Sequence, residues 1–337
     1  MAKSKKFQVT IGIFISLFFL WLAFRKVSLS EMAEAIRDAD YWYFLPATVF
    51  LFLSLWFRAY RWKYFFKSIK PVRVKDLFAS MMIGYMANNV FPMRLGEFLR
   101  AYSIGRTANV SKMSSFATIV VERVLDVLTL LFLLGLAFFL QPFPKWIQDS
   151  GLIILVFALG AILFMALLVY KTESTLRLMG KLLSPLPLRW REKILEYTES
   201  LIDGFSVLKN PQYYFVVALL SLLIWGSYVA IVHLVLMSFG IVQTYHLTIL
   251  ASVVVQIMIG IGVTLPSSPG YVGTYHYLAM QALAIYGVGQ SEALSFAVVL
   301  HLFNYIPSTL VGLYYFGREN VKIADALKEK DWVESLQ

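Results

Sequence analysis

The sequence predicts an all-α, polytopic membrane protein, and three observations support that prediction. Hydrophobic residues make up 59% of the 337-residue chain and charged residues only 15%, and the mean hydropathy is +0.69. A soluble chain of this length needs a larger polar surface. Several apolar runs approach or exceed the ~20 residues that a helix needs to cross a bilayer. These runs lack the alternation of barrel strands, so helices are favoured.

Six apolar runs have the character of full spans. They cover residues 9–24, 41–57, 124–140, 152–170, 213–239 and 293–316. Lysines precede the first run, as in a signal peptide, but no A-x-A-like cleavage site follows it, so we expect it to remain as a helix. Two further stretches, 77–92 and 247–269, end in segments that contain Pro and Gly.

The placement of Lys and Arg predicts the orientation of the spans. Residues 58–76 hold seven basic and one acidic residue, and residues 171–212 hold seven basic and five acidic residues. If both segments are cytoplasmic, so is the N-terminus of this multi-pass protein of the cell membrane. Segments 77–121 and 247–290 must then each enter the membrane and return, either as a re-entrant hairpin or as a pair of broken spans.

The two returning segments divide a single membrane domain, residues 1–337, into two similar units. Each segment has the pair Ile-Gly before a P-x-x-x-G motif, at residues 92–96 and 269–273. Each unit, about 41–140 and 213–316, contains a span, a returning segment and another span, in opposite orientations. This pattern is typical of an inverted repeat whose broken helices meet at the membrane midplane.

Residues 171–212 form the main polar segment between these units. Apolar side chains recur there every three or four residues, at Trp190, Ile194, Tyr197, Leu201, Phe205 and Leu208, which predicts an amphipathic helix. We interpret it as a cytoplasmic connector on the lipid headgroups, with a docking surface for a soluble enzyme as the alternative. Residues 317–337 form a short cytoplasmic tail. A homo-oligomer is compatible with the sequence.

Composition also narrows the functional classes. The chain contains no cysteine, which excludes disulfides and thiolate chemistry. The net charge is +10, but the basic residues flank apolar runs, so we expect contact with anionic headgroups and no nucleic-acid partner. The four histidines show no metal-ligand spacing, and we expect no metal and no other cofactor. Without a phosphate-binding glycine motif, an ATP-driven pump would need a motor from another chain.

Polar side chains gather around the first P-x-x-x-G motif. They are Asn88, Asn89, Arg94, Glu97 and Arg100. Charges inside a membrane usually face partners or a water-filled cavity. If Pro92 begins a helix, Arg94, Glu97 and Arg100 share one face, with a net positive charge beside the helix N-terminus. This predicts a site for a phosphate or carboxylate headgroup, and the alternative is a structural Arg–Glu–Arg clamp.

A second charged group, Glu122, Arg123 and Asp126, begins the span 124–140. These residues either anchor the helix at the interface, or Glu122 or Asp126 pairs with Arg94 or Arg100 across the returning segment.

The second unit is almost uncharged. Between residues 213 and 316 the only formally charged residue is Glu292, yet all four histidines lie there, at His233, His246, His276 and His301. His276 follows Gly273 and Thr274, and His301 precedes Asn304 by three residues. We expect these histidines to line a polar cavity or relay protons, or else to bond neighbouring helices. The turn at 266–273, with Pro266, Pro269 and Gly270, fits a broken helix whose backbone faces a substrate.

These motifs together resemble the lysylphosphatidylglycerol synthase transmembrane family, a flippase-like domain. The matching positions are Pro92, Arg94, Gly96 and Glu97, then Glu122, Arg123 and Asp126, then Pro269, Gly270 and Gly273, then Tyr305, Pro307 and Gly312. The family often has a Glu after the second Gly-rich turn, where this chain has His276. The resemblance is to a stand-alone member without the synthase domain, so it implies lipid translocation and leaves the lipid open.

We therefore expect a lipid translocase, and not an enzyme, that moves an anionic or zwitterionic phospholipid, or a polyprenyl-phosphate-type lipid, through a polar cavity at the midplane. The expected substrate-binding residues are Asn88, Asn89, Arg94, Glu97, Arg100, Glu122, Arg123, Asp126, Pro269, Gly270, Gly273, Thr274, His276, Asn304 and Tyr305. One alternative is a membrane-embedded transferase, or the non-catalytic partner of one, with Glu97, Glu122 or His276 as a base. Another is a scaffold that recruits a soluble enzyme through 171–212.

Overall fold

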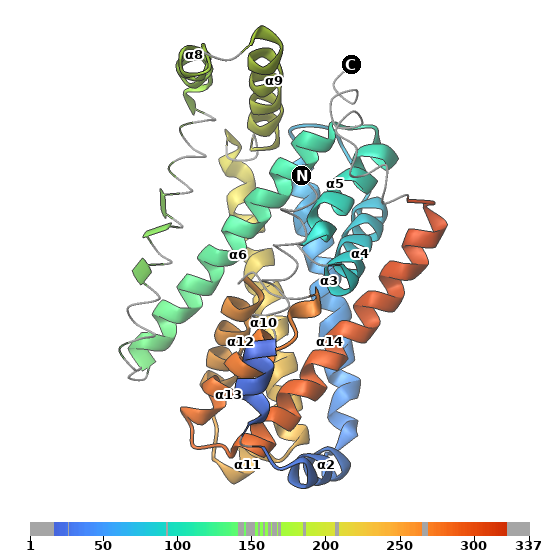
Figure 1. The fold of residues 1–337 in the computed structure, drawn as a ribbon, viewed down its shortest axis with the longest axis vertical. Coiled ribbons are helices and arrows are strands. Elements are labelled where there is room, and N and C mark those ends of the chain that lie inside the picture. Colours follow the sequence, from blue (N-terminus) through green and yellow to red (C-terminus); the bar gives the residue numbers. More distant parts are fainter. Residues whose placement is uncertain are drawn as a thin grey trace.

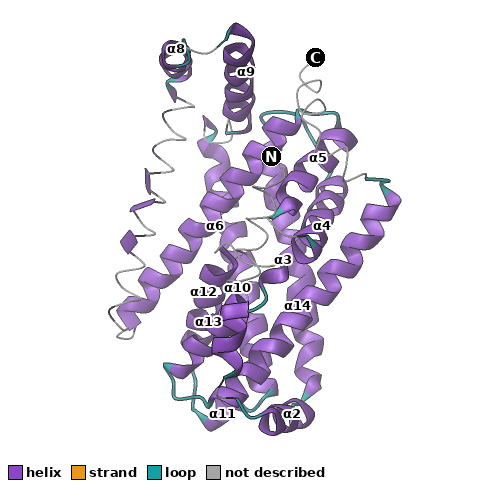
Figure 2. Ribbon diagram, viewed as in Figure 1, coloured by secondary structure: helices purple, strands orange, loops and turns teal. Residues whose placement is uncertain are grey.

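In a computed structural model, the described part of the chain is helical and contains no strand (Figure 2). The residues described are 17–25, 27–91, 94–140, 171–184, 187–205, 209–264 and 269–321, with scattered residues between 145 and 170. The predicted all-α membrane fold is confirmed. About half of each of the predicted spans at 9–24 and 152–170 lies outside the described residues, as do Pro92, Pro266, Leu208 and most of the tail.

Four long helices form the frame of the molecule. They are α3 (Phe44–Phe66), α6 (Lys112–Leu140), α10 (Tyr214–Ser238) and α14 (Gln290–Arg318). Among the described helices, three stretches are long and apolar enough to cross a membrane, Tyr41–Phe66, Pro211–Ser238 and Gln290–Arg318. Large apolar side chains such as Phe52, Phe132 and Leu310 are exposed on the outer faces of these helices, as expected where a helix faces lipid.

Short helices mark the two ends of the bundle. Figure 1 shows α2 (Leu29–Asp38) and α11 (Ile241–Thr244) at one end and α8 (Thr172–Leu182) and α9 (Leu188–Gly204) at the other. The helix α3 runs from the first end to the second, and α10 runs back along it. The chain therefore crosses the bundle in opposite directions in its two halves.

Each returning segment is a hairpin of two helices whose turn lies inside the bundle. The first consists of α4 (Val74–Val90) and α5 (Leu95–Ala108). The second consists of α12 (Ile249–Thr264) and α13 (Thr274–Ala284), with the short helix η4 (Pro269–Tyr271) at its turn. The first hairpin occupies the upper half of Figure 1 and the second the lower half. They approach each other where η4 contacts α4.

The helix contacts of the first half recur in the second. The helix α4 packs on α14, and α12 packs on α6. Likewise α5 packs on α6, and α13 packs on α14. The helices α3 and α10 pack against one another at the centre. The last helix of each half, α6 or α14, thus packs against one helix from each of the two hairpins.

Glycine permits the close crossing inside the first hairpin. A Cβ atom at Gly84 would lie 2.9 Å from the Gly96 carbonyl oxygen, and one at Gly96 would collide with the Gly84 carbonyl. The side-chain oxygen of Asn88 accepts a hydrogen bond from the Gly96 N–H at 2.9 Å. This satisfies one of the free amides in the first turn of α5. The turn is therefore fixed by backbone contact and by one amide side chain.

The polar connector differs from the predicted single helix. Two helices, α8 and α9, occupy it, and α9 packs on α6 rather than only on headgroups. Ile202 and Phe205 are buried, and a Cβ at Gly204 would collide with Ala117 of α6. The amphipathic helix predicted here corresponds to α9. The correction is that the apolar C-terminal end of α9 packs against α6.

Candidate functional site

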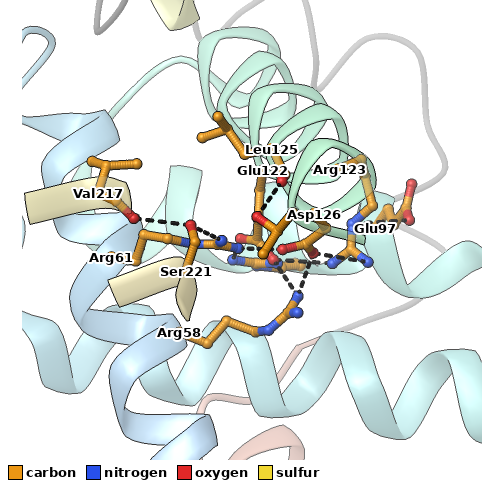
Figure 3. Close-up of polar contacts among 11 residues, drawn as sticks. Arg58, Arg61, Glu97, Glu122, Arg123, Leu125, Asp126, Val217 and Ser221 are labelled. Carbon is orange, nitrogen blue, oxygen red and sulfur yellow. Dashed lines mark hydrogen bonds and ion pairs between the residues drawn. The ribbon is translucent and has the colours of Figure 1, made fainter. Parts of the chain in front are cut away.

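Charged side chains from α3, α5 and α6 meet in a buried ion-pair network (Figure 3). We call this group the arginine network. It consists of Arg58 and Arg61 on α3, Glu97 and Arg100 on α5, and Glu122, Arg123 and Asp126 on α6. At a helical rise of about 1.5 Å per residue, Arg58 lies about 12 Å inside the end of α3 at Phe66. The network is therefore within the bundle, toward the end that carries α9.

Glu122 is the centre of this network and is fully buried. Its carboxylate accepts from Arg58 Nη1 at 2.8 Å, from Arg100 Nη2 at 2.6 Å and from Arg123 Nη2 at 3.0 Å. A carboxylate has enough lone pairs for all these donors. One acidic side chain thus joins three helices.

Asp126 lies one turn further along α6 and binds the two arginines of α3. It accepts from Arg61 Nη2 at 2.6 Å and from Arg58 Nη1 at 3.0 Å. The pairs match because residues three and four apart share a helix face. The side-chain oxygen of Ser221 on α10 accepts a further bond from Arg61 at 2.8 Å.

An aromatic ring completes the burial of Arg100. The guanidinium carbon of Arg100 lies 3.6 Å from the ring centroid of Trp62, an arrangement that stabilises a desolvated cation. The indole N–H of Trp62 donates to the Thr118 hydroxyl at 2.8 Å. Arg100 is therefore held between the Glu122 carboxylate and the Trp62 ring and is only 2% exposed.

The arginine network carries a positive surplus. Its four arginines face three carboxylates, which leaves one positive charge uncompensated within this group. The Nε atom of each of these arginines is buried and has no hydrogen-bond partner among the described residues. Burying an unpaired charge is unfavourable. The arrangement therefore favours an anion at its accessible edge.

That edge is formed by Glu97 and Arg123, whose side chains are 24% and 38% exposed. Their closest ion-pair atoms, Glu97 Oε1 and Arg123 Nε, are 3.9 Å apart, longer than the contacts to Glu122. This pair is loose and half-exposed. It is the part of the network that a charged group from outside could reach without breaking the buried contacts.

Arg94 lies between the two hairpins. It precedes α5 with a left-handed backbone, φ 52°. Its guanidinium donates to the Val263 carbonyl at the end of α12 and lies 5.9 Å from the centroid of the Tyr271 ring. The turn of the first hairpin thus contacts both sides of the turn of the second.

Amide and hydroxyl groups make a second link, from α4 to α14. The side-chain nitrogen of Asn89 donates to the Thr309 hydroxyl at 2.8 Å and to Ser308 at 3.3 Å. The Tyr305 hydroxyl donates to the Asn89 carbonyl at 3.2 Å. A Cβ atom at Gly270, where φ is 66°, would lie 2.7 Å from the Tyr305 ring. These residues hold the second turn against the end of α4.

A buried histidine pair joins the second hairpin to α14, with His276 on α13 and His301 on α14. His276 Nε2 and His301 Nδ1 are 3.1 Å apart, and the Gly273 N–H donates to His276 Nδ1 at 3.3 Å. Thr274 is fully buried, and its hydroxyl donates to the Tyr271 carbonyl. The histidines therefore bond the turn and one another. The described residues contain no group of three or more His, Cys, Asp or Glu side chains placed to hold a metal ion.

Several sequence predictions need correction here. Arg94, Glu97 and Arg100 do not share one face, because α5 begins at Leu95 and Arg94 precedes it. Among the described residues, Glu97 forms its ion pair with Arg123, so the Arg–Glu–Arg clamp within α5 is wrong.

The predicted pairing of Glu122 with Arg100 is confirmed at 2.6 Å. The alternative of interfacial anchoring is wrong, since Glu122 and Asp126 are 0% and 8% exposed. Asn304 donates to the Leu300 carbonyl of its own helix rather than into the space between the hairpins. Asn88 likewise serves the backbone of the first hairpin.

Arg58 and Arg61 were not predicted as site residues, because they were counted in residues 58–76, the segment predicted to be cytoplasmic. The helix α3 continues to Phe66 and takes both arginines into the bundle. Without them, residues 62–76 still hold five basic and one acidic residue, so the predicted orientation keeps its sign. The spacing of two arginines three residues apart, directly after an apolar run, was the available signal.

The fold is a polytopic helical bundle in which two helical hairpins meet near a buried arginine network. These features place the chain among helical membrane proteins rather than soluble enzymes. The chain belongs to the family described as the lysylphosphatidylglycerol synthase TM region, which it matches over residues 9–312.

Two relatives from archaea resemble almost the whole chain. A UPF0104 membrane protein of Methanothermobacter thermautotrophicus is 27% identical over 319 residues, which are 88% of this chain and 92% of the relative. Another, from Methanocaldococcus jannaschii, is 24% identical over 324 residues, 93% of this chain and 95% of the relative.

A third relative is similar over a shorter stretch. A protein of Haloferax volcanii named glycosyltransferase AglD is 28% identical over 133 residues, 39% of this chain and 21% of that protein. No solved structure matches the chain.

Proposed function

We propose that the protein translocates a lipid with an anionic headgroup, a phospholipid or a polyprenyl phosphate, across the cell membrane. The observation that supports this most is the positive surplus of the arginine network, with its half-exposed edge at Glu97 and Arg123. A buried surplus inside a membrane protein marks a substrate path more often than a structural element. Membership of the family supports a role in lipid biology at a coarser level.

The edge of the network is suited to receive a headgroup. A phosphate that approaches Arg123 replaces Glu97 as its partner, because the existing ion pair is long and partly solvated. Arg94 is the second cation beside this edge, and its present contacts are a backbone carbonyl and a ring. Glu97 then competes with the headgroup and promotes its release. Arg58, Arg61 and Arg100 set the potential but stay in place.

The arrangement of the helices suits alternating access. In this proposal residues of about 41–140 and 213–316 are inverted repeats, because the contacts of α4 with α14 and of α5 with α6 recur as α12 with α6 and α13 with α14. The turn of the second hairpin is the opposing gate, held closed by Arg94, Asn89 and Tyr305. The N-terminus and α9 lie on the cytoplasmic side, following the excess of basic residues there.

The experiment is leaflet exchange of fluorescent phosphatidylglycerol in vesicles that contain the purified protein. An impermeant reductant quenches only the outer leaflet, so loss beyond about half of the fluorescence measures exchange. We expect wild-type protein to exceed half, and Arg94→Ala, Arg123→Gln and Glu97→Gln to fall back to it while folding normally. Arg73→Gln is the matched control, because Arg73 forms an exposed ion pair with Asp76 at 2.8 Å.

Two results would contradict this assignment. Normal exchange in the Arg94, Arg123 and Glu97 variants would remove their roles. Loss that stops at half for the folded wild-type protein, with phospholipids and polyprenyl phosphates alike, would remove the translocase.

A second candidate is a membrane partner of a lipid-glycosylating or lipid-modifying enzyme. It is supported by the partial similarity to a protein named a glycosyltransferase. In that case α8 and α9 provide the docking surface for a soluble enzyme. A headgroup-modified lipid that appears on expression of the protein would favour this candidate.

A further inference from the structure

A chain of hydrogen bonds runs in one direction from Gly273 through His276 on α13 to His301 on α14. The Gly273 N–H donates to His276 Nδ1, so that nitrogen carries no proton. The proton of a neutral His276 must then lie on Nε2, which donates to His301 Nδ1 at 3.1 Å. His301 Nδ1 is therefore an acceptor, and His301 carries its own proton on Nε2. The geometry thus specifies two neutral rings of the same tautomer.

One added proton cannot be accommodated by this chain. If the proton joins His276 Nδ1, two donors face each other at Gly273. If it joins His301 Nδ1, the bond between the rings is kept only when His276 Nε2 becomes the acceptor. His276 would then need its proton on Nδ1, which again opposes the Gly273 N–H. Protonation at either ring therefore breaks at least one bond of the chain, either at Gly273 or between the two rings.

That turn is where the two hairpins touch. Gly270 and Gly273 both have positive φ, at 66° and 94°. Tyr305, which donates to the Asn89 carbonyl of α4, has its ring centroid 5.7 Å from that of His301. Releasing Gly273 therefore loosens the contact that we assign as the opposing gate.

His276 and His301 are the two buried imidazoles beside this turn. The Tyr275 ring stacks on His301 with centroids 4.5 Å apart, and the pair is buried, with His276 7% and His301 8% exposed. The helices α10, α12 and α13 contribute no charged residue. The charged residues of the other described segments that pack around α13 and α14 lie near their ends, at Arg25 after the helical residues 17–24, Lys75 and Asp76 of α4, Glu292 and Arg318 of α14, and Glu31, Glu34, Arg37 and Asp38 of α2. Arg94 and Tyr271 flank the turn itself.

We propose that His276 and His301 together bind the one proton that drives lipid translocation. The inference rests on the proposed translocase and adds its energy source. A proton enters the pair, the bond to Gly273 breaks, the turn of the second hairpin separates from α4, and the headgroup at the arginine network gains a path. Loss of the proton to the other side re-forms the closed chain. No covalent bond other than N–H changes.

The first test measures the distribution of fluorescent phosphatidylglycerol between leaflets under an imposed pH gradient. One proton per lipid and a gradient of one pH unit support an asymmetry of up to about tenfold. We expect the wild-type protein to build this asymmetry and His276→Gln and His301→Gln to lose it. His233→Gln is the matched control, because His233 lies in the second half but bonds Ser252 at 2.9 Å, away from the turn.

The outcomes separate the two proposals. Exchange by the wild-type protein that remains symmetric under the gradient would overturn the proton coupling and leave the translocase standing. Absence of exchange with every lipid would overturn the translocase and the coupling with it. An asymmetry that persists in both histidine variants would assign the proton to another group.

A second measurement does not depend on transport. Nitrogen NMR of the ¹⁵N-histidine-labelled protein in nanodiscs reports which ring nitrogen carries the proton, with each signal assigned by its loss in a single variant. We expect His276 and His301 both to be protonated on Nε2 at high pH and to change together when one proton binds. Independent titration of the two rings, or a proton on His276 Nδ1 at high pH, would contradict the chain.

Discussion

The two hairpins share a backbone design but enclose opposite chemistry. The first, α4 and α5, closes over the arginine network, in which seven charged side chains are joined mainly through Glu122. The second, α12 and α13, has no charged residue and holds its turn with a neutral histidine pair. Charges paired inside a low-dielectric interior are hard to rearrange. Neutral hydrogen bonds are easier to exchange.

This difference suggests a division of labour between the halves. The first half, through α3, α5 and α6, provides a fixed positive potential with one loose edge, at Glu97 and Arg123. The second provides a turn that can open, because a single proton is incompatible with its hydrogen bonds. Arg94 joins the two by donating to the Val263 carbonyl across the interface. The translocation that we propose needs both a binding potential and a moving part, and these lie in separate halves of the chain.

The largest expected effect on stability comes from the centre of the network. Glu122→Ala leaves Arg58, Arg100 and Arg123 without their shared carboxylate in a buried site. Removing one partner of a buried pair costs about 3–5 kcal/mol, so we expect a large loss of folded protein and of thermal stability in detergent. Glu97→Ala is the matched change at the exposed edge and should alter stability by less than about 1 kcal/mol. Equal losses in the two variants would mean that Glu122 does not hold the network.

An intermediate effect is expected where each hairpin depends on glycine. Gly96→Ala places a methyl group against the Gly84 carbonyl, and Gly270→Ala adds strain at φ 66° and contact with Tyr305. We expect each to lower the unfolding free energy by about 1–3 kcal/mol. Gly226→Ala on α10 is the control, since nothing lies within 4 Å of its added Cβ, and it should be neutral or slightly stabilising. Tolerance of Gly96→Ala with a strong effect at Gly226 would contradict the described crossing.

The smallest expected effect concerns Glu319, which follows α14 and accepts from the Ser103 hydroxyl of α5 at 2.6 Å. Burial raises the pKa of the Glu319 carboxyl above its ordinary value, and the Ser103 bond opposes this. The folded state therefore binds this proton more tightly than the unfolded state, and its contribution to stability falls as pH rises through the raised pKa. Glu319→Gln should gain on wild type in thermal stability between pH 5 and pH 8. A constant difference across that range would show that the carboxyl does not titrate there.

The sequence predicts the fold better than the site, for physical reasons. Long apolar runs leave few alternatives in a bilayer, so the helices α3, α6, α10 and α14 are foreseeable from composition. Helix ends are less determined, and the extension of α3 to Phe66 changes Arg58 and Arg61 from loop charges to buried partners. The left-handed turn at Arg94 was unforeseen for a similar reason, because it separates Arg94 from the face of α5.

The contacts within the site also differ in how far the sequence predicts them. The spacing of Glu122 and Asp126 indicates a shared face, and the contact of Glu122 with Arg100 was within reach of the sequence. The contact between His276 and His301 joins two helices, and no local pattern specifies it. Tertiary packing alone brings His276 Nε2 and His301 Nδ1 to within 3.1 Å of each other.

The most direct test of the account is the headgroup selectivity of leaflet exchange. Fluorescent phosphatidylglycerol and phosphatidylcholine would be compared in the same vesicles, with wild-type protein and with Arg123→Gln. The account predicts faster exchange of the anionic lipid by wild type and loss of that preference in the variant, because the surplus charge at the edge disappears. Equal exchange of both lipids by wild type, or a preference that survives in Arg123→Gln, would contradict it.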